Sequence, residues 1–397
     1  MPNSRIPGSS KGFETGGSAA AGGFEFQAKL GAMFGLQLLA QRPVDHSLGL
    51  GAAVPAWIRF ESEAPVDDIL VATSQDGFIA VQAKTSVDLS TNSKGGLAKT
   101  IQQFVRHWLE CRDGDRTDLW NRPLDPARDR LVLAVGPSAP SSIRLDLPAA
   151  LRSLSQPTPM ALNKEEGRAL EVFKSCVEAA WVATTSEDMP AQLLRELAAL
   201  IRVITFDPDG TDSQALDTMA AVVVEPPQAR PLINTLAVIS KRWMTQRGGG
   251  DLAKLRQELG AEGITLRAPP QFDRDIKKLK AHSLQIGVDL QSYEKIDQAD
   301  GVIKITRDCQ SAALAAARDG SLLLIGEPGA GKSAVINTLA RNLRAHGDVV
   351  EMAVDRYSVQ DLAGLQQELD LDHDLVSVLQ AWDGPTEGWL VIDALDA

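Results

Sequence analysis

Residues 322–333 read Leu-Leu-Leu-Ile-Gly-Glu-Pro-Gly-Ala-Gly-Lys-Ser, and the prediction for the C-terminal part of the chain rests on this stretch. An apolar run of strand length leads into a loop of the form G-x-x-x-x-G-K-[S/T], and Ala334–Leu343 follows with helical spacing. Glycines let backbone N–H groups converge on phosphate oxygens, and the N-terminus of the following helix favours negative charge. The stretch therefore predicts a strand, a nucleotide-binding loop and a helix, in that order.

Two side chains at the end of this loop have expected chemical roles. Lys332 is expected to reach the β- and γ-phosphates of ATP, and the Ser333 hydroxyl to bind Mg²⁺. A later apolar strand, Trp389–Asp393, ends on an acid that is expected to accept a hydrogen bond from a water bound to the same Mg²⁺ or from Ser333. The expected nucleotide-binding residues are Gly326, Glu327, Pro328, Gly329, Ala330, Gly331, Lys332 and Ser333, with Ser333 and Asp393 at the metal.

Composition is that of an ordinary globular protein. The chain has 397 residues, 44% of them hydrophobic and 23% charged, which predicts two or three domains with substantial cores. No apolar run approaches the ~20 residues of a membrane helix, and the Gly/Ser/Ala-rich N-terminus lacks the apolar segment of a signal peptide. Three widely separated cysteines suggest buried thiols in a reducing compartment. We therefore expect a cytoplasmic protein with no membrane partner.

The net charge of −12 argues against a protein coated with basic surface for nucleic acid. It leaves a local basic groove open, because counterion release depends on the charges at the contact and not on their total.

The N-terminal part predicts a helix, three strands, a second helix and a further strand. Helical spacing and β-branched or aromatic content mark the elements. Their expected ranges are Phe24–Ala40, Trp57–Glu63, Asp67–Thr73, Phe78–Thr85, Leu97–Cys111 and Leu131–Val135.

Four polar residues lie on the second and third of the predicted strands. Asp67 and Asp68 open the second strand, and Gln82 and Lys84 lie two apart on the third, so that they share one face. A hairpin would bring an aspartate beside this pair. An acid, an amide oxygen and a lysine at one point could hold Mg²⁺ and activate water for attack on a phosphodiester. The same four residues also fit the solvated face of an edge hairpin, and the residues alone leave both interpretations open.

This pattern resembles the PD-(D/E)XK restriction-endonuclease-like superfamily, in the branch with glutamine before x-Lys. The resemblance implies that Asp67 or Asp68 binds the metal, with Asp67 preferred, and that Gln82 and Lys84 complete the motif. It also implies a contribution from Glu25 or Gln27. The glutamine departs from the acidic form and removes one negative charge from the metal site. The stretches that carry the resemblance are Phe24-Glu25-Phe26-Gln27, Val66-Asp67-Asp68-Ile69 and Val81-Gln82-Ala83-Lys84.

The middle of the chain reads as mainly helical and shows no metal cluster or catalytic triad. Asn163 and Asp251 are expected N-caps. The helix Asp273–His282 has a basic face, which we expect to be exposed to solvent. The predicted helices are Lys164–Thr184, Ala191–Ile204, Pro231–Gln246, Leu252–Leu259 and Asp273–His282.

The end of the chain, Asp393-Ala394-Leu395-Asp396, resembles the D-G-L-D pattern of STAND P-loop NTPases, which are related to NACHT proteins. The resemblance implies that Asp396 lies near the γ-phosphate and positions the attacking water. Many relatives have an acid at the next position, where this chain has Ala397. Because a P-loop sheet needs further strands, we expect the sequence to be a fragment of a longer protein.

Together these features predict an α/β protein with four parts: a flexible arm (1–22), a restriction-endonuclease-like αβββαβ domain (23–145), a helical connector (146–300) and the start of a P-loop parallel sheet (301–397). The resemblances imply an ATP-regulated, Mg²⁺-dependent DNA endonuclease of bacterial antiphage defence. Its partners would be double-stranded DNA, further copies of itself on activation, and a trigger sensed beyond residue 397. Two alternatives are an ATP-driven translocating restriction subunit and a non-enzymatic signalling scaffold with an inactive nuclease fold.

Overall fold

The computed structural model describes residues 15–114, 118, 120–158, 160–291, 295–298, 301–304, 307–327, 329–359, 361–382 and 388–394. The chain divides into two compact units, residues 1–262 and 263–397. Within the described residues the fold is mixed α/β, with a six-stranded mixed sheet in the first unit. No described helix combines the length and the apolar character needed to cross a membrane.

The first unit is built on a sheet with strand order β5-β4-β3-β2-β1-β6. Strands β3, β4 and β5 are parallel, whereas β1 pairs antiparallel with both β2 and β6, and β2 pairs antiparallel with β3. The strands are β1 (Pro55–Phe60), β2 (Ile69–Thr73), β3 (Phe78–Lys84), β4 (Arg130–Val135), β5 (Ile201–Thr205) and β6 (Gly249–Asp251).

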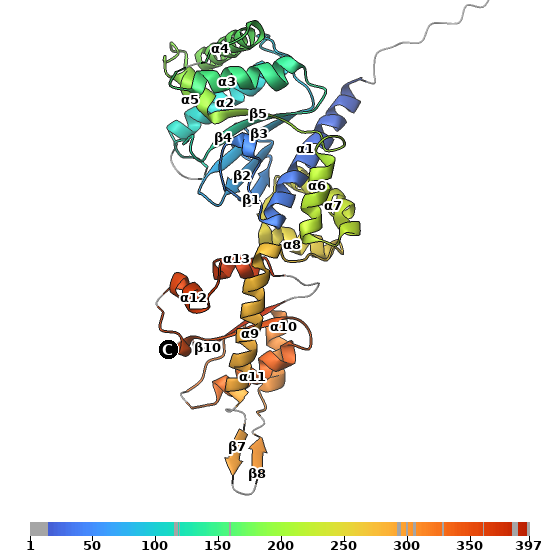
Figure 1. Ribbon diagram of the computed structural model, residues 1–397, viewed down its shortest axis with the longest axis vertical. Coiled ribbons are helices and arrows are strands. Elements are labelled where there is room, and N and C mark those ends of the chain that lie inside the picture. Colours follow the sequence, from blue (N-terminus) through green and yellow to red (C-terminus); the bar gives the residue numbers. More distant parts are fainter. Residues whose placement is uncertain are drawn as a thin grey trace, which may run out of the picture. The chain divides into compact units, whose positions relative to one another are not determined.

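Helices cover both faces of this sheet. Figure 1 shows α2–α5 on one face and α1 with α6–α8 on the other. The central strands are buried along almost their whole length, as expected for a sheet covered on both sides. The helices are α1 (Thr15–Ala40), α2 (Gly96–Arg112), α3 (Leu147–Ser155), α4 (Lys164–Thr185), α5 (Leu193–Leu200), α6 (Ser213–Val223), α7 (Ala229–Gln246) and α8 (Leu252–Ala261).

Local signals position several of these elements as predicted. Asn163 forms a full capping box with Glu166 at the start of α4. The Asp251 side chain accepts a hydrogen bond from the Lys254 N–H at the start of α8. The predicted N-terminal order of helix, three strands, helix and strand is confirmed by α1, β1, β2, β3, α2 and β4.

Two local predictions are wrong. The helix α1 begins at Thr15, so part of the expected flexible arm is helical. The range predicted as one helix, Ala191–Ile204, holds α5 followed directly by strand β5, which pairs with β4. The sequence Ile-Arg-Val-Ile-Thr is β-branched and finds a parallel partner at the sheet edge, and this pairing overrides its helical periodicity. Strands β5 and β6 thus come from the range predicted as a connector.

The second unit contains a pair of parallel strands, β9 (Val349–Ala353) and β10 (Trp389–Asp393). Helix α9 packs on β9 through a core that includes Phe272, Ile276, Val350 and Met352. The remaining elements are β7 (Lys295–Gln298), β8 (Gly301–Lys304), α9 (Asp273–Leu290), α10 (Gln310–Asp319), α11 (Lys332–Leu343), α12 (Leu362–Glu368) and α13 (Leu375–Gln380).

The strand predicted before the nucleotide-binding loop does not form. Residues 321–327 form no regular secondary structure and pair with no described strand, and Leu323 and Ile325 are 69% and 83% exposed. A strand needs a hydrogen-bonding neighbour, and among the described residues β10 pairs with β9 and not with this segment.

Candidate functional site

Asp68 lies where the β2–β3 ladder ends in the first unit. The pairing of β2 with β3 ends at Ile69 and Val81. Beyond this pair, β2 has no residue that could accept a hydrogen bond from the Ala83 N–H of β3. The Asp68 carboxylate takes that position and accepts the Ala83 N–H at 2.8 Å through Oδ2. The side chain therefore terminates the ladder.

The two polar residues of β3 converge on the same carboxylate oxygen. Gln82 Nε2 donates to Asp68 Oδ2, and Lys84 Nζ lies 3.9 Å from it. Gln82 is 2% exposed, whereas the Lys84 side chain is 37% exposed. The hairpin thus brings together the acid, amide and lysine that the sequence predicts.

The structure brings Asp68, and not the preferred Asp67, to Gln82 and Lys84. Asp67 Oδ1 instead accepts a hydrogen bond from Gln103 Nε2 of α2 at 3.3 Å. The side chains of adjacent residues in an extended chain point in different directions. The register of β2 on β3 places Asp68, and not Asp67, opposite Gln82.

Helix α1 contributes Gln27 and not Glu25. Gln27 Nε2 donates both to Glu61 Oε1 at 3.0 Å and to the Asp68 carbonyl at 2.9 Å. Glu25 is ion-paired with Lys241 of α7. Sequence reasoning missed Glu61, whose only local signal is its place after an apolar strand.

The donor set at this point suits a hard divalent cation. Gln82 Oε1 is buried and has no hydrogen-bond partner among the described residues, while Nε2 of the same amide donates to the Asp68 carboxylate. An amide oxygen and a carboxylate are ligands that Mg²⁺ accepts. Across the described part of the chain, no group of three or more His, Cys, Asp or Glu is arranged to hold a metal, so a cation here would also need the amide and water.

Burial raises the pKa of Asp68 from 3.8 to about 6, although Lys84 and the Ala83 N–H act in the opposite direction. In the native state the carboxyl resists ionisation. Above pH 6 the carboxyl is charged in both the folded and the unfolded chain, and the buried charge lowers the stability of the folded state. Below pH 4 it is neutral in both states, and the cost is absent.

We therefore expect Asp68→Asn to stabilise the first unit in EDTA at pH 7.5 by on the order of 2 kcal/mol, and much less at pH 4. Hydrogen exchange of peptides covering β2 and β3, measured across a denaturant series on the full chain, would report the free energy of unfolding. An equal effect at both pH values would contradict the pKa shift.

In the second unit, the predicted nucleotide-binding loop is followed by a helix, as expected. Gly329 and Gly331 adopt φ of 80° and 85°, conformations that favour glycine, and α11 begins at Lys332. Lys332 Nζ donates to the Gly326 carbonyl at 2.8 Å, so the lysine side chain lies against the backbone of its own loop. Ser333 lies in the first turn of α11; Glu327 is exposed, and the Ala330 N–H donates to its carbonyl at 3.1 Å. Pro328 lies outside the described residues.

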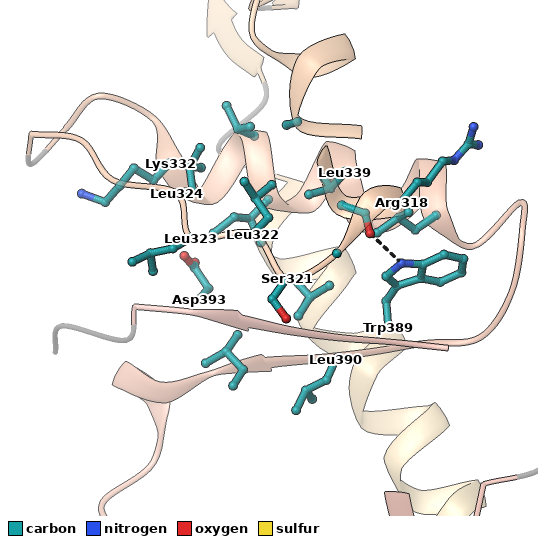
Figure 2. A pocket seen from close by; sticks show the side chains of 18 of the residues that line it. Arg318, Ser321, Leu322, Leu323, Leu324, Lys332, Leu339, Trp389, Leu390 and Asp393 are labelled. Carbon is teal, nitrogen blue, oxygen red and sulfur yellow. Dashed lines mark hydrogen bonds between the residues drawn. The ribbon is translucent and has the colours of Figure 1, made fainter. Parts of the chain in front are cut away.

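A pocket of about 960 Å³ lies between the 320–326 segment, α11 and β10. Figure 2 shows Lys332 and Asp393 toward one end of it and Trp389 toward the other, where the indole N–H donates to the Ala317 carbonyl at 3.2 Å. Asp393 is 6% exposed at the end of β10, as the sequence predicts. Asp396 and Ala397 lie outside the described residues.

The sequence also gave no signal for Arg307. A Cβ atom placed on Gly331 would come within 2.4 Å of Arg307 Nη2, so this guanidinium lies directly against the loop. Its Nη1 is buried and lacks a hydrogen-bond partner within the described residues. Arg307 is therefore a second positively charged side chain, beside Lys332, at the start of α11.

Comparison with known proteins gives no relative. No protein-family model matches the chain, and no curated protein or solved structure matches it.

Proposed function

We propose that the chain is a metal-dependent nuclease controlled by a nucleotide switch. The observation that carries the proposal is the convergence of Gln82, Lys84 and the Ala83 N–H on one oxygen of Asp68. The P-loop sequence and the glycine conformations of its loop support the second part of the proposal. The resemblance to nuclease–STAND proteins supports DNA as the substrate and assembly as the response to ATP.

Each residue of the first site has a distinct part in phosphodiester cleavage. Asp68 and Gln82 would hold the cation through the carboxylate and the orphaned amide oxygen, after the amide turns. Bound Mg²⁺ would polarise the phosphate and acidify a water molecule. The partly exposed Lys84 ammonium would stabilise the negative charge that develops on the phosphate oxygens.

The second site would read the nucleotide state. Backbone N–H groups at the start of α11, with Lys332 and Arg307, would bind the phosphates, and Ser333 and Asp393 would hold the accompanying Mg²⁺. An ATP-driven change in assembly would then bring nuclease sites together on DNA.

The direct test is degradation of linear double-stranded DNA by the full-length protein in Mg²⁺, with and without ATP. We expect cleavage in Mg²⁺ and none in EDTA. Absence of cleavage under every nucleotide condition, while ATP still drives oligomerisation, would overturn the nuclease part and favour a signalling scaffold.

Lys332→Ala should weaken ATP binding by about 10- to 100-fold, since a hydrogen bond to a charged group contributes about 1.5–3 kcal/mol. Titration calorimetry with Mg·ATP measures this loss. The matched control is Lys277→Ala, which removes an exposed lysine of α9 in the same unit. Equal affinities of the wild type and Lys332→Ala would refute the nucleotide assignment.

A further inference from the structure

A second carboxylate meets Asp68 at the end of the sheet. Phe60 of β1 pairs with Ile69 of β2, so Glu61 and Asp68 are opposite each other just beyond the paired strands. The Glu61 N–H donates to the Asp68 carbonyl at 3.4 Å. Because Gln82 is opposite Asp68 on β3, three neighbouring strands deliver Glu61, Asp68 and Gln82 to one place.

Gln27 holds the Glu61 side chain there. A single nitrogen, Nε2, donates to both Glu61 Oε1 and the Asp68 carbonyl, which ties the two acidic residues together. Gln27 is 8% exposed, so its amide is fixed by packing of α1.

The backbone at Glu61 has an unusual conformation. Its φ is 48°, in the left-handed region that residues other than glycine rarely adopt. Such conformations are concentrated at functional sites. The strain turns the chain where β1 ends.

Charge balance indicates what Glu61 could supply. Asp68 contributes one negative charge, Gln82 none, and Lys84 one positive charge, so these three residues together are neutral. A hard divalent cation is bound mainly by carboxylate oxygens. Gln82 Oε1 is buried and has no partner among the described residues, on the same amide whose nitrogen donates to Asp68, and this points independently to a missing ligand.

We propose that Glu61 is a third protein ligand of the cation site, supplying the charge that glutamine at position 82 leaves out. Gln27 is then a positioning residue that aims Glu61. This inference rests on the proposed metal-dependent function and names a ligand on β1 that the motif of β2 and β3 does not include.

The test is Mn²⁺ binding to the full-length protein without nucleotide or DNA, followed by electron paramagnetic resonance. The site is defined as the binding that Asp68→Asn removes. We expect Glu61→Gln to weaken that binding by at least about tenfold, because it keeps the hydrogen bond from Gln27 and loses the charge. Glu63→Gln is the matched control, as Glu63 is an exposed acid two residues away. Circular dichroism would show that each variant is folded.

The outcomes separate this inference from the proposed function. Weaker binding in Glu61→Gln alone supports Glu61 as a ligand. Equal binding in the wild type and Glu61→Gln overturns that role, and cleavage that depends on Lys84 would then still stand. If the wild type shows no Asp68-dependent Mn²⁺ binding, the inference fails, and DNA cleavage decides the function separately.

Discussion

Lys84→Ala is expected to lower the rate of Mg²⁺-dependent DNA cleavage by about 10²–10³-fold, the usual cost of removing one group that stabilises transition-state charge. The ammonium lies 3.9 Å from Asp68 Oδ2 and is partly exposed, so it can reach a phosphate beside a cation held by that carboxylate. Single-turnover cleavage of a labelled duplex measures the effect on the chemical step.

Two further variants make this result specific. Lys84→Arg keeps the charge and should retain more activity than Lys84→Ala. Lys174→Ala removes a partly exposed lysine of α4 that pairs with Glu171 and should cleave like the wild type. Full activity of Lys84→Ala, in a preparation free of contaminating nuclease, would refute the assignment of this site.

Asp129→Ala is expected to destabilise the first unit by about 3–5 kcal/mol, because it leaves a partly buried guanidinium without its counter-ion. Asp129 is fully buried before β4 and accepts hydrogen bonds from Arg122 at 2.7 and 2.9 Å. It also accepts the N–H groups of Phe78 and Asp125, both at 2.8 Å. The residue therefore ties the start of β3 to the loop before β4.

The matched control is Asp217→Ala, which breaks an Arg–Asp pair of similar length at the surface. Its partner is Arg230 at 2.6 Å, and both side chains are more than one third exposed. We expect a loss below about 1 kcal/mol there. Denaturant unfolding followed by hydrogen exchange of β3 peptides measures both. Similar losses for the two variants would contradict a special role for burial.

Local patterns were sufficient where an element depends on its own residues. Helix caps at Asn163 and Asp251 and the glycines of the loop before α11 act over a few residues, and the structure has them as predicted. Apolar strands β3, β4 and β10 were also predicted to within a residue or two.

Patterns failed where the outcome depends on a distant partner. Residues 201–205 become a strand because β4 offers a parallel edge, whereas residues 322–325 pair with no described strand. Hydrogen bonding between strands is a property of the pair, and a single segment does not contain it.

The candidate cation site shows the same division. The sequence by itself determined that Asp67 or Asp68 would meet Gln82 and Lys84, because a hairpin and period-2 alternation require it. Only the tertiary structure selected Asp68, since the register of β2 on β3 leaves the Ala83 N–H for that carboxylate to accept. It alone brought in Glu61 and chose Gln27 over Glu25, because β1 and α1 reach this point through pairing and packing that no local pattern encodes.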